Sequence, residues 1–428
     1  MASVLAPPSI RPFYREKAPS LRSNFRWTLT GNVVYSACQW GMISTLAKLG
    51  DAALVGRFAL GLAITAPIFM FSNLQLRGVQ ATDARSDFDF ADYFTLRLMT
   101  TAVGLVLVCA IARFGGFDPT TAWVLLLLGV SKAIESLSDV IAGLLQKEER
   151  LDRVAISLMI RGVCSLLAFA VTFRTLHSLL AAVAALVLVW LSVYVFYDLR
   201  QAHLLVRHSP RFFALRPTRL RRLALLSAPL GIVMTLVSLN VNLPRYLLER
   251  ATGPADLGVF ASLAYLLVAV NLIVNALGQS VVSRLARLFA DGEVRGFHRI
   301  LNRLLAFAAM ILLLGVPLAH LVGGRLLTVL YRPEYGRQNS LFVLLVATAG
   351  VSSLASYLGY GMTAARVFRR QVPVIGAATC TTAACSLLLI PRFGSSGAAV
   401  ALLIGAGVQA LGSAVVLSHA LGKIERVA

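Results

Sequence analysis

Blocks of about twenty apolar residues, separated by short charged segments, run through the whole chain of 428 residues. About twenty apolar residues in a helix span the hydrocarbon core of a bilayer. Composition agrees with this pattern, because 58% of the residues are hydrophobic and only 14% are charged, whereas soluble domains carry roughly 25% charged residues. The chain is therefore predicted to be an all-α polytopic membrane protein, and two soluble domains of ordinary size are excluded.

The apolar blocks predict twelve membrane spans. The first 20 residues are basic and proline-containing, and they have no continuous apolar h-region, so a tail without a cleaved signal peptide is expected. Spans 5 and 6, like spans 11 and 12, are separated by only three or four residues and are expected to form tight hairpins. The predicted spans are 26–47, 53–74, 94–113, 121–143, 154–173, 177–197, 222–247, 257–280, 302–323, 339–361, 372–391 and 396–418.

Lysine and arginine in the loops predict the orientation. With the N-terminus inside, 28 of the 40 basic residues lie on the cytoplasmic side, ten on the other side and two within spans. Both termini are thus expected on the cytoplasmic side of the membrane. Basic loops that face anionic membrane lipids explain the net charge of +21, and no nucleic-acid binding is expected without a recognition fold.

An internal repeat divides the chain into two halves. A shift of 202 residues aligns GRFAL at Gly56 with GVFAS at Gly258, and Arg97 with Arg299. The shift covers six spans and preserves their orientation, which predicts two parallel six-helix halves around a central cavity. The expected parts are a tail at 1–25, a half at 26–197, a basic linker at 198–221, a half at 222–418 and a tail at 419–428.

Signatures of enzymes and metal sites are missing from the sequence. The five cysteines all fall in apolar spans without a CxxC pair, and the six histidines are scattered, so no disulfide framework, metal site or cofactor is expected. Nucleotide-binding, nucleophile-elbow and zinc-protease motifs are absent. The chain is predicted not to be an enzyme, and transport energy would come from H+ or Na+, the membrane potential or the substrate's own gradient.

Polar residues form one-sided stripes in the first helix of each half. Span 1 carries such a stripe, that of span 7 ends in the charged Arg245, and span 8 carries a further stripe that includes Asn275. We expect these stripes to line the cavity, although interhelical hydrogen bonding would give the same pattern. The expected cavity-lining polar residues are Asn32, Gln39, Asn242 and Asn275.

Two segments carry a resemblance to a known family. The sequence from Leu46 to Asp83, LAKLGDAALVGRFALGLAITAPIFMFSNLQLRGVQATD, and the run PRFGSSGAAVA from Pro391 resemble the Wzx-like polysaccharide flippase branch of the multidrug/oligosaccharidyl-lipid/polysaccharide (MOP) exporters. The resemblance implies an inner-membrane protein that moves an undecaprenyl-pyrophosphate-linked oligosaccharide from the cytoplasmic to the periplasmic leaflet, with a polysaccharide polymerase as a potential partner. Before the proline, CTTAACSLLLIP lacks the asparagine of many relatives, so no site is transferred from that helix.

Charges within the spans are the candidate site residues, because a charge in the hydrocarbon is costly. The cations expected to bind the lipid diphosphate are Lys132, Arg161, Arg57 and Arg245. Glu135 and Asp139, on the same helix face as Lys132, are the coupling-ion candidates, and an Arg161–Glu135 pair is expected from their similar depth. The alternative is a structural cluster between spans 4 and 5, with Arg57 and Arg245 reaching the outer interface.

The loop SNLQLRGVQATDARSDFDFADY after span 2 is rich in aspartate, and its repeat mate is rich in arginine. One hypothesis is a cytoplasmic gate that closes when these loops meet. The alternative is that the aspartates cap span 3. The gate candidates are Arg77, Asp83, Asp87, Arg284 and Arg287.

Competing functions are a multidrug or metabolite antiporter of the same superfamily (MATE-like), a lipid II flippase and a non-transporting scaffold of a glycan-assembly complex. The excess of buried cations favours an anionic cargo.

Overall fold

The computed structural model describes residues 21–83, 87–206, 212–365 and 367–425, and these are helical without a strand. The predicted all-α fold is confirmed. Residues 1–20 of the expected N-terminal tail, residues 207–211 of the linker and the last three residues of the expected C-terminal tail lie outside the described residues. The helices of the first half are α1 (Leu21–Leu49), α2 (Ala52–Asn73), α3 (Leu76–Thr82), α4 (Phe90–Phe114), α5 (Pro119–Lys147), α6 (Leu151–Leu176), α7 (Leu179–Val193), the π-helix η1 (Tyr194–Asp198) and α8 (Leu199–Leu205).

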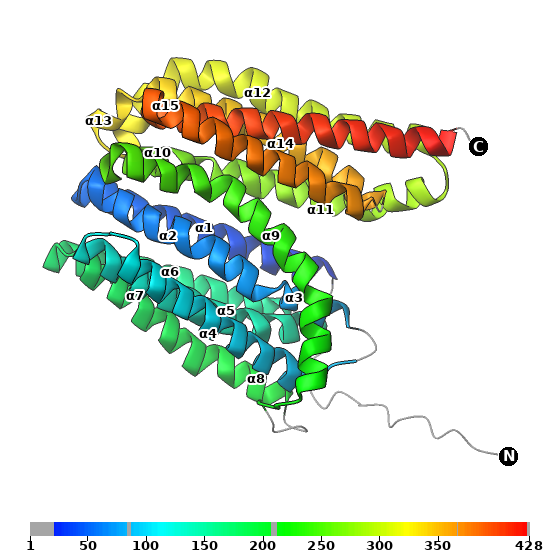
Figure 1. Ribbon diagram of the computed structural model, residues 1–428, viewed down its shortest axis with the longest axis horizontal. Helices are drawn as coiled ribbons and strands as arrows, with labels where there is room; N and C mark the ends of the chain where they lie inside the picture. Colours follow the sequence, from blue (N-terminus) through cyan, green and yellow to red (C-terminus); the bar gives the residue numbers. More distant parts are fainter. Residues whose placement is uncertain (1–20, 84–86, 207–211, 366, 426–428) are drawn as a thin grey trace.

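The second half repeats the arrangement of long, nearly parallel helices (Figure 1). Nine helices in the described ranges are long and apolar enough to cross a membrane, so the number of twelve spans stays a prediction. The segment α15 counts once, although it consists of two helices that join at Gly394 (φ 54°, not helical), where the last hairpin was expected. The helices are α9 (Pro217–Thr252), α10 (Pro254–Leu266), α11 (Val268–Ala290), α12 (Val294–Leu330), α13 (Pro333–Gly336), α14 (Asn339–Ala364) and α15 (Phe368–Glu425).

Helix α9 connects the two halves. Figure 1 shows it starting beside α8 in the lower half and crossing to α10 in the upper half. Its first turns bury Leu220 and Leu223 in the core of the first half. The start of α1 and the end of α15 lie at the same end of the bundle, here called the termini end; the opposite end is called the far end.

The hydrophobic cores show how the halves meet. At the far end one core cluster contains residues of both halves, such as Phe58 of α2 and Phe260 of α10. At the termini end each half has a separate cluster, one around Tyr93 and Leu96 and one around Phe297. Among the described residues, the shared core joins the halves at the far end, whereas at the termini end the first half packs against the start of α9 and not against the Phe297 cluster.

Helices α2 and α10 cross very closely at the far end. A Cβ atom added to Gly56 would lie 1.7 Å from the carbonyl oxygen of Pro254, and one added to Gly258 would lie 1.7 Å from that of Ala52. Only glycine permits this approach of two backbones. We call this contact the glycine crossing.

Polar contacts reinforce the glycine crossing. Trp40 Nε1 of α1 donates to Tyr331 Oη at 3.0 Å, and Tyr331 Oη donates to the Ser262 carbonyl at 2.9 Å. Arg332 also donates to the carbonyl of Lys48 at 2.8 Å. The far end is therefore closed by both packing and hydrogen bonds between the halves.

Candidate functional site

Two neighbouring cavities share lining residues: the first is lined by the first half and by Met234 of α9, and the second, which is lined by both halves, lies where the central cavity was predicted. The larger, of about 470 Å³, is nearer the termini end, and the second, of about 360 Å³, lies deeper toward the far end. Lys132 and Glu135 of α5 line both, so their pair stands where the cavities meet. The first is lined by Ala66, Phe69, Met70, Asn73, Gln75, Arg77, Gly78, Lys132, Glu135, Asp139, Gln146 and Met234; the second by Tyr35, Ser36, Gln39, Phe58, Leu62, Leu128, Ser131, Lys132, Glu135, Leu186, Trp190, Arg245, Ala264, Tyr265 and Val268.

The Lys132–Glu135 pair forms within α5. Lys132 Nζ lies 2.6 Å from Glu135 Oε2, and the i, i+3 spacing places both side chains on one face of the helix. Both side chains are only partly exposed. The expected position of these two residues at the cavity is therefore observed, and each charge already has a partner of opposite sign.

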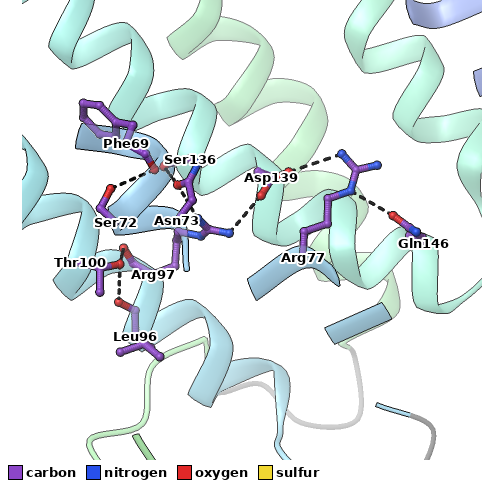
Figure 2. A network of polar contacts seen from close by, with 10 residues as sticks. All are labelled: Phe69, Ser72, Asn73, Arg77, Leu96, Arg97, Thr100, Ser136, Asp139 and Gln146. Carbon is purple, nitrogen blue, oxygen red and sulfur yellow. Dashed lines mark hydrogen bonds and ion pairs between the residues drawn. The ribbon is translucent and has the colours of Figure 1, made fainter. Parts of the chain in front are cut away.

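Asp139 belongs to a network of polar contacts at the termini-end cavity (Figure 2). Its carboxylate accepts from Arg97 Nη2 at 3.0 Å and from Arg77 Nη1 at 3.4 Å. Arg97 is completely buried and also donates to Asn73 Oδ1, which accepts from Ser136 as well. Two arginines hold Asp139, which makes it a poor candidate for exchanging a coupling ion.

The break between α2 and α3 positions Arg77. Leu74 and Gln75 both adopt left-handed backbone conformations, with φ values of 49° and 51°. Such conformations cost non-glycine residues of order 1–3 kcal/mol each and persist where the surrounding structure imposes them. They end α2 after Asn73 and direct α3 so that Arg77 Nε donates to Gln146 Oε1 of α5 at 3.0 Å (Figure 2).

Arg161 does not pair with Glu135, and that expectation is wrong. Its partner is Asp198, with 2.9 Å between Arg161 Nη2 and Asp198 Oδ2 and both side chains 5% exposed. Ser157 donates to the same carboxylate at 2.7 Å, and the Trp190 ring lies 5.1 Å from the guanidinium carbon. Arg161 lines neither large cavity; it lies against a small one of about 90 Å³.

The other two expected cations differ in their surroundings. Arg57 lies 3.8 Å from Asp118, the N-cap residue of α5 at the far end, and it lines neither large cavity. Arg245 lines the deeper cavity. Its only polar contact recorded among the described residues is Asn242 Oδ1 at 3.4 Å, and its buried Nε has no partner. Within the described part of the chain, Arg245 is thus a cavity cation without a carboxylate partner.

The four expected cavity-lining polar residues also have different surroundings. Gln39 lines the deeper cavity, and Asn242 contacts Arg245 while donating to the Ser238 carbonyl at 2.9 Å. Asn32 donates to the Thr28 carbonyl of its own helix at 2.8 Å. Asn275 accepts from Tyr360 Oη of α14 at 3.0 Å, which is the interhelical bonding considered as the alternative.

The aspartate-rich loop is bound by the linker rather than by its repeat mate. Arg216 pairs with Asp89, and Arg219 lies 3.1 Å from Asp92. Asp89 and Asp92 form the capping box of α4. No ion pair of Arg284 or Arg287 is recorded in the described ranges, so in this conformation the aspartates follow the capping alternative.

Asp83 organises the same loop. Its carboxylate accepts from the N–H groups of Asp87 and Phe88, at 3.0 and 3.2 Å, and from Tyr93 Oη. Burial by itself raises the pKa of Asp83, but these backbone hydrogen bonds outweigh it, so the net pKa is below the ordinary value. Asp83 therefore stabilises the loop in its ionised form.

No protein-family model matches the chain. The capsular polysaccharide biosynthesis protein CapF of Staphylococcus aureus is 27% identical over 387 residues, covering 89% of this chain and 95% of that protein.

Solved structures show the fold. A multidrug resistance MATE family transporter of the MOP superfamily, in its inward-facing conformation, matches with a TM-score of 0.71 at 13% identity, covering 93% of this chain and 98% of its own. The lipid II flippase MurJ, in an inward closed conformation, matches with a TM-score of 0.75 at 9% identity, covering 92% and 88%. The expected resemblance to the MOP exporters is confirmed, and the two solved structures are those of a transporter and a flippase.

Proposed function

We propose that this membrane protein of the MOP exporter fold is a flippase for a polyprenyl-diphosphate-linked oligosaccharide used in surface polysaccharide synthesis. The cargo would move from the cytoplasmic to the outer leaflet of the bacterial inner membrane. The similarity to CapF over most of both chains supports a role in polysaccharide assembly. The folds of MATE transporters and of MurJ support a transport mechanism.

Arg245 is the observation that carries the proposal. Its guanidinium faces a cavity between the halves and has no carboxylate partner in the described ranges. An uncompensated charge within the membrane is costly, so an anionic ligand that offsets it would bind favourably. A guanidinium with free N–H groups suits a diphosphate, which accepts several hydrogen bonds at once.

Lys132 would provide the second contact. It lies at the junction of the two cavities and is paired with Glu135. A diphosphate at Arg245 would compete with Glu135 for the ammonium group of Lys132. If Glu135 binds H+ while the cargo takes over Lys132, ion binding and cargo binding become linked, which makes Glu135 the better coupling candidate than the doubly paired Asp139.

Alternating access would move the cargo across the membrane. The far end is closed by a shared core, the glycine crossing and the Trp40–Tyr331 hydrogen bond. At the termini end the cores are separate. With both termini in the cytoplasm, as the distribution of basic loops predicts, this conformation would receive cargo from the cytoplasmic leaflet.

A flipping assay in vesicles with a polyprenyl-diphosphate-linked sugar tests the proposal. Replacing Arg245 with Gln removes charge-assisted hydrogen bonds that contribute roughly 1.5–3 kcal/mol, so transport should fall about 10- to 100-fold. Arg250→Gln is the matched control, because Arg250 is an exposed cation of the same helix that contacts Tyr246. Equal transport by the Arg245→Gln variant and the control would refute the anion site.

Deletion of the gene separates the competing functions. Loss of a flippase blocks polymer export and accumulates the lipid-linked unit, and wild type but not Arg245→Gln restores export. A change in drug tolerance without accumulation would instead identify a MATE-like antiporter. Restoration by a well-expressed Arg245→Gln variant that is inactive in vesicles would indicate a scaffold.

A further inference from the structure

Helix α12 carries a row of arginines at its start. Arg295, Arg299 and Arg303 are spaced by four residues, so they lie on one face of the helix. All three are exposed, whereas Phe297 and Leu301 on the opposite face are buried in the second half's core. We call these three residues the arginine row.

The row stands just outside the apolar part of α12. Residues 304–324 contain no Lys, Arg, Asp or Glu. At about 1.5 Å per residue they extend roughly 31 Å, which matches the hydrocarbon core of about 30 Å. The three arginines precede this segment and are spread over about 12 Å of helix. They therefore lie at the depth of the lipid headgroups on the termini end.

The face of α12 that bears the row continues as a lipid-facing surface. Met310, Leu313 and Leu321 follow on the same face and are 46%, 70% and 78% exposed. In a chain that crosses a membrane, such exposed large apolar side chains contact acyl chains. A lipid whose tails pack against Leu313 would place its headgroup beside the arginines.

Within the described residues, no carboxylate neutralises the charges of the row. No ion pair of these arginines is recorded in the described part of the chain, and the nearest carboxylates in sequence are Asp291 and Glu293. The repeat mate of Arg299 is Arg97, which is buried and paired with Asp139. Arg299 is thus exposed in the second half, whereas its repeat mate in the first half is buried and paired.

We propose that the arginine row is a binding site for the headgroups of anionic phospholipids in the leaflet at the termini end. Three guanidinium groups in line with an apolar, lipid-facing surface match the phosphate and the acyl chains of one lipid class. Binding there would anchor the second half to its leaflet at the mouth of the bundle. The inference depends on the membrane-spanning fold and not on the proposed cargo.

Native mass spectrometry of the purified chain with phosphatidylglycerol or phosphatidylcholine of identical acyl chains tests the site. The wild type should prefer phosphatidylglycerol, and each Arg→Gln change should weaken that preference about fivefold. The triple variant R295Q/R299Q/R303Q should lose most of the preference, whereas the triple Arg→Lys variant should keep it. Loss of the preference in the Arg→Lys variant would overturn the electrostatic basis.

A matched control removes the same charge at the far end. Arg113, Arg174 and Arg325 are exposed and lie at the far ends of α4, α6 and α12, and their triple Gln variant should retain the preference. An equal loss in this control, an unchanged preference in R295Q/R299Q/R303Q, or complete displacement by inorganic phosphate would each refute the lipid site. If the triple variant does not fold, the single variant R299Q gives the same test through its fivefold effect.

Discussion

Removal of the Asp139 charge should destabilise the protein more than removal of the Arg97 charge. In Asp139→Asn, the completely buried Arg97 guanidinium loses its carboxylate partner at 3.0 Å and keeps only Asn73. Breaking a buried ion pair costs about 3–5 kcal/mol. Because the Asp139 side chain is 28% exposed, water partly screens the pair, and a loss of about 3 kcal/mol in unfolding free energy is expected.

In Arg97→Met the situation differs. Asp139 keeps Arg77 at 3.4 Å and has access to water, while an apolar side chain of similar length fills the buried site. We expect a loss of about 1–2 kcal/mol, the range for a hydrogen bond or partly exposed pair. In the double variant Asp139→Asn with Arg97→Met, no buried charge remains, so the effects should fall short of additivity by about 1–3 kcal/mol.

Denaturant unfolding of the detergent-purified protein measures these differences, with Asn339→Ala at the far end as a variant outside the network. Asn339 donates to the His320 carbonyl and has no contact with Asp139, so its effect should add to that of Asp139→Asn. A larger loss in Arg97→Met than in Asp139→Asn, or strict additivity of those two, would refute the argument that Asp139 neutralises a buried Arg97.

Four further predictions concern the gate, the coupling and the acidic loop. Gly56→Ala should force the halves apart at the far end and lower the free energy of unfolding by about 1–3 kcal/mol. In a chain whose native cysteines have been replaced, it should also increase thiol labelling of a cysteine introduced by Gln39→Cys. Gly376→Ala is the control, because a Cβ atom at Gly376 meets open space, and it should have neither effect. Glu135→Gln should abolish the dependence of flipping on an H+ or Na+ gradient without lowering the melting temperature as Asp139→Asn does; an intact gradient dependence would contradict it. Arg219→Gln, which breaks a partly exposed pair, should cost less than about 1 kcal/mol but speed hydrogen exchange in the first turns of α9; unchanged exchange would remove its anchoring role. The folded-state pKa of Asp83 is lowered, so the stability that its carboxylate contributes is present above its ordinary pKa and is lost as the pH falls through the lower folded value. At that acidic pH the amides of Asp87 and Phe88 should exchange hydrogen faster than their intrinsic rates predict. The Asp83→Asn variant should show no such change with pH.

The membrane fold and the cavity were predictable because hydrophobic periodicity and charge placement are local features of the sequence. Lys132 and Glu135 are three residues apart on one helix, so their shared face was predicted from helical geometry alone, although Glu135 was expected to pair with Arg161. The position of Arg245 in the cavity followed from the polar stripe of span 7. Each of these inferences needed only one helix.

Partners that depend on exact helix ends were missed. Arg97 was counted with the cytoplasmic cations because it falls in the first turn of a span expected to begin at residue 94, but the Asp89–Asp92 capping box starts α4 at Phe90 and carries Arg97 into the buried interior. Asp198 was assigned to the linker, but the π-helix η1 continues the helical path and directs its carboxylate toward Arg161. The capping box was visible in the sequence, whereas the π-helix carries no comparable signal.

The glycine crossing relates the two halves in another way. Gly56 contacts the Pro254 carbonyl and Gly258 contacts the Ala52 carbonyl. The 202-residue shift relates Gly56 to Gly258 and Ala52 to Pro254, so it converts one contact into the other. Two copies of a single six-helix chain, paired about a twofold axis, would make this contact with one glycine used twice. In the fused chain each position mutates alone, yet each remains limited by a backbone oxygen that belongs to the other half. A gene duplication would therefore remain visible in the backbone contacts of this crossing, whereas side chains elsewhere in the two halves have diverged.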